Sequence, residues 1–297
     1  MDSEITPLRK LEIDRIKPYP AGKQPAVNPP VDQPVGIFDS GVGGLTVLKV
    51  FKDRFPQEDV IYLADTIRIP YGGRPPQEII KINQHILAYF SERNVKMVIM
   101  ACGTSSAIAY PVLKDKYPFP IVSLIGPGSE AAVEATKNGK IGILATVGTI
   151  NSGAYQKQIK EIKKEAEVLG EACPLFVPLI EGGFYQADET KKVAREYLKP
   201  LLAFGVDTII LGCTHYPHLL PILSEIAGRS VTFIDPAERA VEAARKTLKK
   251  LDLINPRTLS GETEYQVTGQ ERQFEELGSR LLGKPVALAK KLDLGGI

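Results

Sequence analysis

The amino-acid sequence predicts an α/β protein of two pseudo-symmetric domains with mainly parallel sheets, and an active site in the cleft between them. Three observations support this prediction. Short apolar runs rich in valine and isoleucine recur along the chain, segments of helical period separate most of them, and the two halves of the chain repeat each other in outline. Strands that alternate with helices are typical of parallel sheets built from βαβ units.

The expected strands are apolar without polar alternation, which is typical of strands that are buried on both faces. They are expected at residues 35–40, 59–65, 95–101, 119–125, 139–146, 174–180, 206–212 and 231–235. The clearest helix lies at residues 75–93, where five apolar side chains fall on one face. These side chains are Ile79, Ile82, Ile86, Leu87 and Phe90.

The stretch before the first strand ends in "KPYPAGKQPAVNPPVDQP", in which proline and glycine leave no room for a regular element. We interpret residues 1–34 as an N-terminal extension. Two roles stay open for it, a disordered tail or an arm that packs on a neighbouring subunit. The assembly state stays open with it, and a homodimer is one alternative.

The composition is that of an ordinary soluble protein, and a small molecule is the expected partner. The 297 residues are 43% hydrophobic, and 37 basic against 35 acidic side chains give a net charge of +2, so neither a nucleic acid nor a membrane surface is expected as a partner. No apolar run reaches the ~20 residues of a membrane span, and the N-terminus lacks the apolar core of a signal peptide. Three widely spaced cysteines predict free thiols in a reducing compartment, so a cytoplasmic location is expected.

The internal repeat brings two of the cysteines into equivalent positions. The stretch "VKMVIMAC" aligns with "VDTIILGC" 111 residues later, and "VGIFDSGVG" aligns with "IGILATVGT" 106 residues later. Cys102 and Cys213 therefore both stand at the carboxyl end of an expected strand, which is where ligands bind in open α/β sheets. If the two halves face each other, each wall of the cleft carries one thiol.

Two opposed thiols suit racemisation, because one can remove a proton from a carbon while the other delivers a proton to the opposite face. A thiol with a pKa near ~8.5 needs only modest tuning for this acid–base chemistry. Asp39, His215 and Glu181 are the candidates for that tuning. Their non-catalytic alternatives are a helix N-cap, a solvated imidazole and a surface carboxylate, and Cys173 is interpreted as a core residue.

Two cofactor hypotheses fit the sequence poorly. The turn "DSGVGGLT" matches a dinucleotide-binding motif at Gly41 and Gly43 but has Thr46 at the last glycine position, although Asp65 follows at about the expected distance. The stretch "CTHYPH" supplies zinc-ligand residue types but no C-x-x-C pair. No cofactor and no metal are therefore expected, and the turn after the first strand is expected to offer N–H groups to a substrate carboxylate.

Six ordered motifs resemble the glutamate racemase family of the aspartate/glutamate racemase superfamily. They are "GIFDSGVGGLTVLK" (36–49), "ADTIRIPYG" (64–72), "ACGTSSA" (101–107), "IGILATVGTI" (141–150), "PLIEGG" (178–183) and "GCTHYPHL" (212–219), and residues 265–283 resemble the family's C-terminal end. The resemblance implies a second domain, residues 129–236, inserted into a first domain of residues 35–128 plus 237–297. It also implies cofactor-independent interconversion of L- and D-glutamate, with D-glutamate supplied for peptidoglycan.

The same resemblance implies roles for individual residues. Cys102 and Cys213 are the catalytic pair, assisted by Asp39, Glu181 and His215. The substrate-binding positions and their supporting residues are Asp39, Ser40, Tyr71, Gly72, Gly103, Thr104, Thr146, Thr149, Thr214 and His215.

One position departs from the family pattern. Gly103 stands where the family has asparagine, and Ser105 stands where it has alanine. Ser105 or a water filling the gap, with glutamate as the substrate, is the favoured interpretation. Two alternatives stay open: an enlarged site for another acid (aspartate or other amino acid racemase, isomerase or decarboxylase), and a non-catalytic homologue that binds an acidic ligand or a protein partner.

Overall fold

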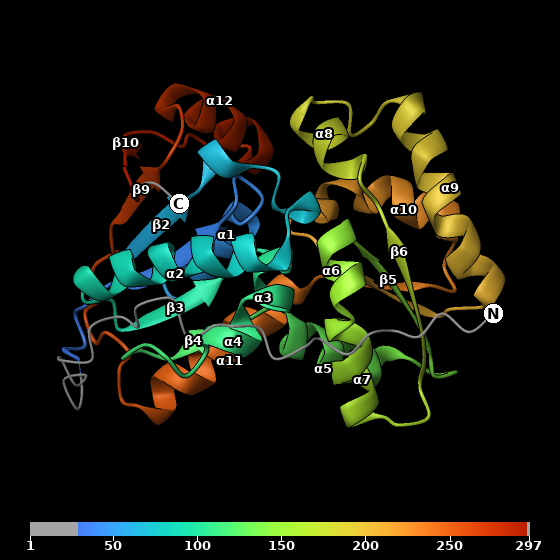
Figure 1. Ribbon diagram of the computed structural model, residues 1–297, viewed down its shortest axis with the longest axis horizontal. Coiled ribbons are helices and arrows are strands. Elements are labelled where there is room, and N and C mark those ends of the chain that lie inside the picture. Colours follow the sequence, from blue (N-terminus) through green and yellow to red (C-terminus); the bar gives the residue numbers. More distant parts are fainter. Residues whose placement is uncertain (1–28, 296–297) are drawn as a thin grey trace.

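The computed structural model describes residues 29–295 and contains two parallel sheets (Figure 1). The first sheet has the order β10-β9-β2-β1-β3-β4, with β1 (Val35–Asp39), β2 (Val60–Ala64), β3 (Met97–Met100), β4 (Ile121–Val122), β9 (Thr263–Val267) and β10 (Lys290–Lys291). The second has the order β6-β5-β7-β8, with β5 (Lys140–Ala145), β6 (Glu167–Ala172), β7 (Thr208–Leu211) and β8 (Thr232–Ile234). The predicted α/β fold with mainly parallel sheets is confirmed. Of the predicted extension, residues 1–28 lie outside the described part of the chain.

Helices cover both faces of these sheets. The α-helices are α1 (Leu45–Arg54), α2 (Pro76–Glu92), α3 (Gly103–Ile108), α4 (Tyr110–Leu113), α5 (Ile125–Ala135), α6 (Val147–Ser152), α7 (Ala154–Ile162), α8 (Phe176–Glu181), α9 (Asp188–Phe204), α10 (Leu220–Ala227), α11 (Pro236–Lys250) and α12 (Glu271–Leu282). Short 3-10 helices are η2 (Thr66–Arg68), η3 (Tyr71–Gly73) and η4 (Tyr216–Leu219). Among these elements, α2 confirms the helix predicted from its apolar face.

The core follows from the strands' apolar sequences. On one face of the first sheet, β1 and β2 pack with α2 through Phe38, Leu63 and Ile86; on the other face, α1, α11 and α12 cover the sheet. Helix α11 packs on both α5 and α1, and the chain then enters β9 of the first sheet, so the first sheet is built from both ends of the described chain (Figure 1). The boundaries at residues 34, 128 and 236 stay a prediction. Within residues 29–295, no helix is long and apolar enough to cross a membrane.

One strand prediction is wrong. Residues 174–180, "PLFVPLI", contain the start of α8 instead of a strand, and the second sheet takes β6 from the more polar "EVLGEA". A short apolar run fits a buried helix as well as a buried strand, and Pro178 is tolerated because it lies in the first turn of α8. The sequence of β6 lacks a continuous apolar run because this strand lies at the sheet edge and is only half-buried.

Candidate active site

A cavity of about 400 Å³ lies where the carboxyl ends of both sheets meet. Most of the residues predicted for the site line it: Asp39, Ser40, Tyr71, Gly72, Cys102, Gly103, Thr104, Thr146, Glu181, Cys213, Thr214 and His215. Thr149 does not line it and instead lies behind Thr146, whose side-chain oxygen is 2.9 Å from its own. The sequence did not indicate an apolar part of the wall formed by Ile69, Pro70, Val147, Cys173, Pro174, Val177 and Pro178.

Cys102 reaches the cavity from the first sheet. It lies two residues after the end of β3 and occupies the N-cap position of α3, and only 5% of the residue is exposed. Its thiol lies 4.0 Å from Ser40 Oγ. Burial and the negative charge of Asp39 raise the pKa of the Cys102 thiol to about 12, because both disfavour a thiolate. Cys102 is therefore protonated at neutral pH.

Cys213 reaches the same cavity from the second sheet, two residues after the end of β7. Its sulfur lies 3.8 Å from His215 Nδ1, and His215 Nε2 lies 3.0 Å from Glu181 Oε1. Burial alone would lower the pKa of His215, but the hydrogen bonds to Cys213 and Glu181 and the nearby charges outweigh burial and raise this pKa to about 10. At neutral pH the imidazole is thus a cation between the Cys213 sulfur and the Glu181 side chain.

Asp39 connects the two halves of the site. It ends β1, is fully buried and accepts hydrogen bonds from Gly41 N–H at 3.0 Å, Ser40 Oγ at 3.3 Å and Thr214 Oγ1 at 3.3 Å. Burial raises the pKa of Asp39, while His215 and these hydrogen bonds oppose that rise. Its carboxylate is thus held by hydrogen bonds from its own turn and from Thr214, which belongs to the other half of the site.

A row of three threonine hydroxyls makes a second connection. Thr104 Oγ1 on α3 lies 2.9 Å from Thr146 Oγ1, which in turn lies 2.9 Å from Thr149 Oγ1. Thr146 is the N-cap of α6, so its orientation is fixed by that helix. The row thereby places hydroxyl groups of both halves beside the cavity.

Gly103 lies against the backbone of the other half. A Cβ atom added to Gly103 would lie 2.2 Å from the carbonyl oxygen of Gly212, far inside normal contact distance. Any side chain at this position would therefore force the two strand ends apart. The missing asparagine side chain leaves no empty space here, because the Gly212 carbonyl occupies that volume.

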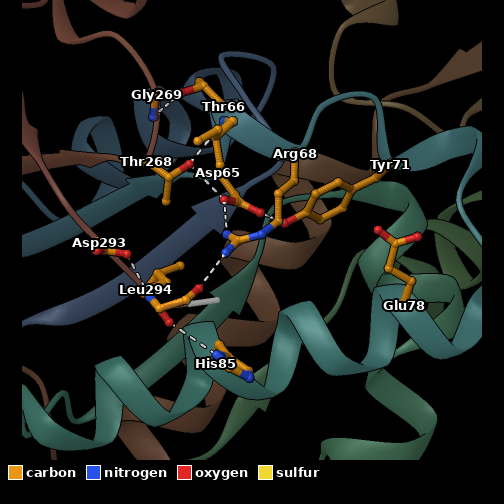
Figure 2. Close-up of polar contacts among 12 residues, drawn as sticks. Asp65, Thr66, Arg68, Tyr71, Glu78, His85, Thr268, Gly269, Asp293 and Leu294 are labelled. Atoms are coloured by element: carbon orange, nitrogen blue, oxygen red, sulfur yellow. Dashed lines mark hydrogen bonds and ion pairs between the residues drawn. The ribbon is translucent and has the colours of Figure 1, made fainter. Parts of the chain in front are cut away.

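Tyr71 lines the cavity, and its hydroxyl points toward Asp65 (Figure 2). Asp65 is completely buried and accepts hydrogen bonds from Tyr71 Oη at 2.6 Å, Arg68 Nη1 at 2.7 Å and Thr268 Oγ1 at 2.8 Å. The carboxylate is thus already saturated and enclosed. It is not available to a ribose, as the dinucleotide alternative requires.

Cys173 lines the cavity as part of the core of the second half. It is 1% exposed, packs among Leu144, Phe176 and Tyr216, and its pKa is raised by burial. This agrees with its interpretation as a core residue. In the described ranges, no group of three or more His, Cys, Asp or Glu side chains could hold a metal ion.

Comparisons with known proteins point to one family. The family model Asp/Glu/Hydantoin racemase matches residues 46–244. The chain is 47% identical to a glutamate racemase from Microcystis aeruginosa over 84% of this chain and 88% of that protein, and 40% identical to one from Enterococcus faecalis over 88% and 96%.

Solved structures give the same result. The glutamate racemase isoform RacE1 from Bacillus anthracis has a TM-score of 0.85 at 32% identity, covering 88% of this chain and 98% of that chain. A glutamate racemase from Francisella tularensis, in complex with D-glutamate, has a TM-score of 0.84 at 33% identity, covering 89% and 98%. The two-sheet arrangement is thus the one that these enzymes share.

Proposed function

Because this chain belongs to the Asp/Glu/hydantoin racemase family and is an isomerase, we propose that it interconverts L- and D-glutamate without a cofactor. The observation that carries the proposal is the placement of Cys102 and Cys213, which line one cavity from two different sheets. Two acid–base groups on opposite sides of a bound amino acid suit inversion at its α-carbon. The choice of glutamate is supported by the relatives and by the structural neighbour that holds D-glutamate.

The two thiol groups lie beside different charges. The His215 cation beside Cys213 stabilises a thiolate there, whereas burial and Asp39 keep Cys102 in its neutral form. In one direction the Cys213 thiolate removes the α-proton and the Cys102 thiol donates a proton to the opposite face. In the reverse direction Cys102, now a thiolate, removes the proton and Cys213 donates one. Glu181 holds His215 in its charged form.

The remaining cavity residues suit an amino acid with two carboxylates. Ser40, Thr104 and Thr214 line it from both halves, and residues with hydroxyl groups are suited to hydrogen bonding with carboxylates. The apolar wall formed by residues such as Val147 and Val177 suits the methylene groups of the side chain. The proposed product, D-glutamate, would serve peptidoglycan synthesis in the cytoplasm.

Exchange of the α-proton tests the proposal directly. In D₂O, NMR should show loss of the α-proton signal of both L- and D-glutamate, and a panel that includes aspartate should exchange far more slowly. Cys102→Ser and Cys213→Ser should each lower racemisation by more than a thousandfold, because a hydroxyl is a much weaker acid than a thiol.

Cys173→Ser is the matched control, since it changes a buried thiol that also lines the cavity but takes no part in the proposed reaction. It should retain racemisation within about tenfold. No exchange from either glutamate enantiomer in the wild-type protein would refute the substrate, and full activity in either catalytic variant would refute the two-thiol mechanism.

A further inference from the structure

Helix α3 carries three consecutive hydroxyl residues, and two of them have clear partners. Thr104 contacts Thr146, and Ser106 Oγ donates a hydrogen bond to the Met100 carbonyl and accepts one from Leu124 N–H. Ser105 between them is completely buried, and its hydroxyl has no hydrogen-bond partner within residues 29–295. Buried side-chain oxygens without a partner are uncommon and unfavourable, so this hydroxyl calls for an explanation.

The position of Ser105 relative to Cys102 supplies one. Cys102 is the N-cap of α3 and Ser105 is the third residue of that helix. In helices generally, the side chain and the N–H of this third residue face back toward the N-cap. Both the Ser105 hydroxyl and its backbone N–H lower the pKa of the Cys102 thiol, partly offsetting the rise caused by burial and Asp39.

The ionisable groups near Cys102 do not favour its ionisation. Asp39 at the end of β1 is an acid, Cys213 after β7 is itself the candidate thiolate, and Tyr62 of β2 and Tyr71 of η3 have raised pKa values and stay neutral. These four groups bring no positive charge to Cys102. Cys213, in contrast, has the His215 cation beside it.

We propose that Ser105 is a positioning residue that donates a hydrogen bond from its hydroxyl to the Cys102 sulfur when Cys102 becomes a thiolate. The hydroxyl has no hydrogen-bond partner in the structure, and a hydrogen bond to a charged sulfur is stronger than one to a neutral thiol. It therefore stabilises the thiolate relative to the thiol, which is the form needed when Cys102 acts as the base. This inference rests on the proposed acid–base role of Cys102.

Alkylation tests Ser105 without requiring turnover. The rate at which iodoacetamide modifies Cys102 is measured between pH 7 and 10 in wild-type protein, Ser105→Ala and Ser105→Thr, with peptide mass mapping to separate Cys102 from Cys213. Loss of one hydrogen bond to a charged sulfur corresponds to a pKa rise of about one unit. A thiolate of higher pKa is also a better nucleophile, so the net effect is alkylation of Cys102 about threefold slower in Ser105→Ala.

Three comparisons make the result decisive. Ser105→Thr, which keeps the hydroxyl, should restore the wild-type rate, and the Cys213 rate should be the same in all variants. Ser106→Ala is the matched control because it removes a neighbouring hydroxyl that is bonded elsewhere, and near-UV circular dichroism verifies that each variant is folded. Equal Cys102 rates in wild type and Ser105→Ala, or an equal slowing in Ser106→Ala, would overturn the proposal.

The racemisation assay separates this proposal from the proposed function. If Cys102 alkylation depends on Ser105 but the wild-type protein does not exchange the α-proton of glutamate, the hydrogen bond stands and the proposed function fails. If racemisation is found but alkylation is insensitive to residue 105, the role of Ser105 fails alone.

Discussion

At the scale of single residues, Gly103 determines how closely the two halves of the site approach each other. Its backbone lies against the Gly212 carbonyl, at the point where one half meets the other. Cys102 and Cys213 are the direct sequence neighbours of these two glycines. The contact therefore sets the separation of the two proposed acid–base groups, and a side chain at residue 103 would change it.

Gly103→Ala should accordingly lower kcat/KM for glutamate racemisation by at least tenfold. The added Cβ would lie 2.2 Å from a backbone oxygen, whereas ordinary contacts begin at 3.4 Å, so the strand ends must separate. A misplacement of about 1 Å in an active site can cost ~100-fold in rate. Gly126→Ala is the control, because its Cβ meets no atom within 4 Å, and it should keep wild-type activity. Wild-type kcat/KM in Gly103→Ala would contradict the steric argument.

At the scale of elements, η4 and the residue before it give two histidines opposite titration behaviour. His215, the N-cap of η4, has a pKa raised to about 10 by its partners despite burial. His218, in the last turn of η4, has a pKa lowered to about 4 by burial and by the charge of His215. One short element and the residue before it thus carry a neutral imidazole and a cation at pH 7, because Cys213 and Glu181 of α8 both form hydrogen bonds with His215.

Glu181→Gln should therefore lower the pKa of His215, because glutamine keeps a hydrogen-bonding oxygen but removes the charge. The chain has only three histidines, so their ring signals can be followed separately by NMR between pH 4 and 11. In the wild type, the His215 signal should titrate near pH 10, and in Glu181→Gln at a lower pH, with kcat/KM reduced and the His85 signal unaffected. An unchanged His215 titration in the variant would rule out Glu181 as the partner that holds the charge.

The raised pKa of His215 also makes the stability of the folded protein depend on pH. Because the folded-state pKa lies above the ordinary value of 6.5, the stabilising contribution of His215 is fully present below about pH 6.5. It is lost progressively as the pH rises toward 10. Glu181→Gln should lower the pH at which this contribution is completely lost, because it lowers the folded-state pKa of His215. Urea unfolding at a series of pH values would show the change.

The sequence predicts strands that are buried on both faces, but it does not predict elements whose conformation depends on tertiary contacts. Strands such as β1 and β7 have continuous apolar sequences because helices cover them on both sides, and the residues directly after them form the site. Edge strand β6 and helix α8 were missed or misassigned because exposure and turn geometry, which depend on the fold, decide them. The contact of Gly103 with Gly212 and the burial of Ser105 arise only when segments distant in sequence pack together.

At the scale of the whole molecule, the stabilising polar networks and the active-site cavity lie at opposite ends of the same strands. Cys102 lies at the carboxyl end of β3, and Lys96 lies at the other end of that strand. The Lys96 ammonium is fully buried, 2.6 Å from Glu58 Oε2 and 2.5 Å from the Val31 carbonyl. Glu58 Oε1 also accepts a hydrogen bond from Asn255 N–H. The pair therefore connects four segments around the first sheet, those that contain Val31, Glu58, Lys96 and Asn255.

The second sheet has a counterpart at its equivalent end. Asp207, directly before β7, accepts hydrogen bonds from Thr136 Oγ1 at 2.6 Å, Lys137 N–H at 2.7 Å and Asn138 N–H at 2.8 Å. Burial opposes the ionised form, but these hydrogen bonds outweigh it and lower the pKa of Asp207. In both sheets, polar networks at the amino ends of strands hold connecting segments together, while the carboxyl ends carry the cavity.

Lys96→Met should consequently lower the free energy of unfolding without altering the site. Removing one partner of a buried ion pair leaves an uncompensated charge, here Glu58, and typically costs about 3–5 kcal/mol. The double variant Lys96→Met/Glu58→Gln should recover part of this loss, since the introduced glutamine carries no charge and still offers an oxygen to Asn255 N–H. Urea unfolding followed by circular dichroism measures both effects, and kcat/KM of Lys96→Met, taken at a temperature where it is fully folded, should stay within about twofold of wild type. A free energy of unfolding for Lys96→Met equal to that of wild type would contradict the role assigned to the pair. So would a double variant whose free energy of unfolding is no higher than that of the single variant. A loss of kcat/KM in folded protein would show instead that the two ends of β3 are coupled.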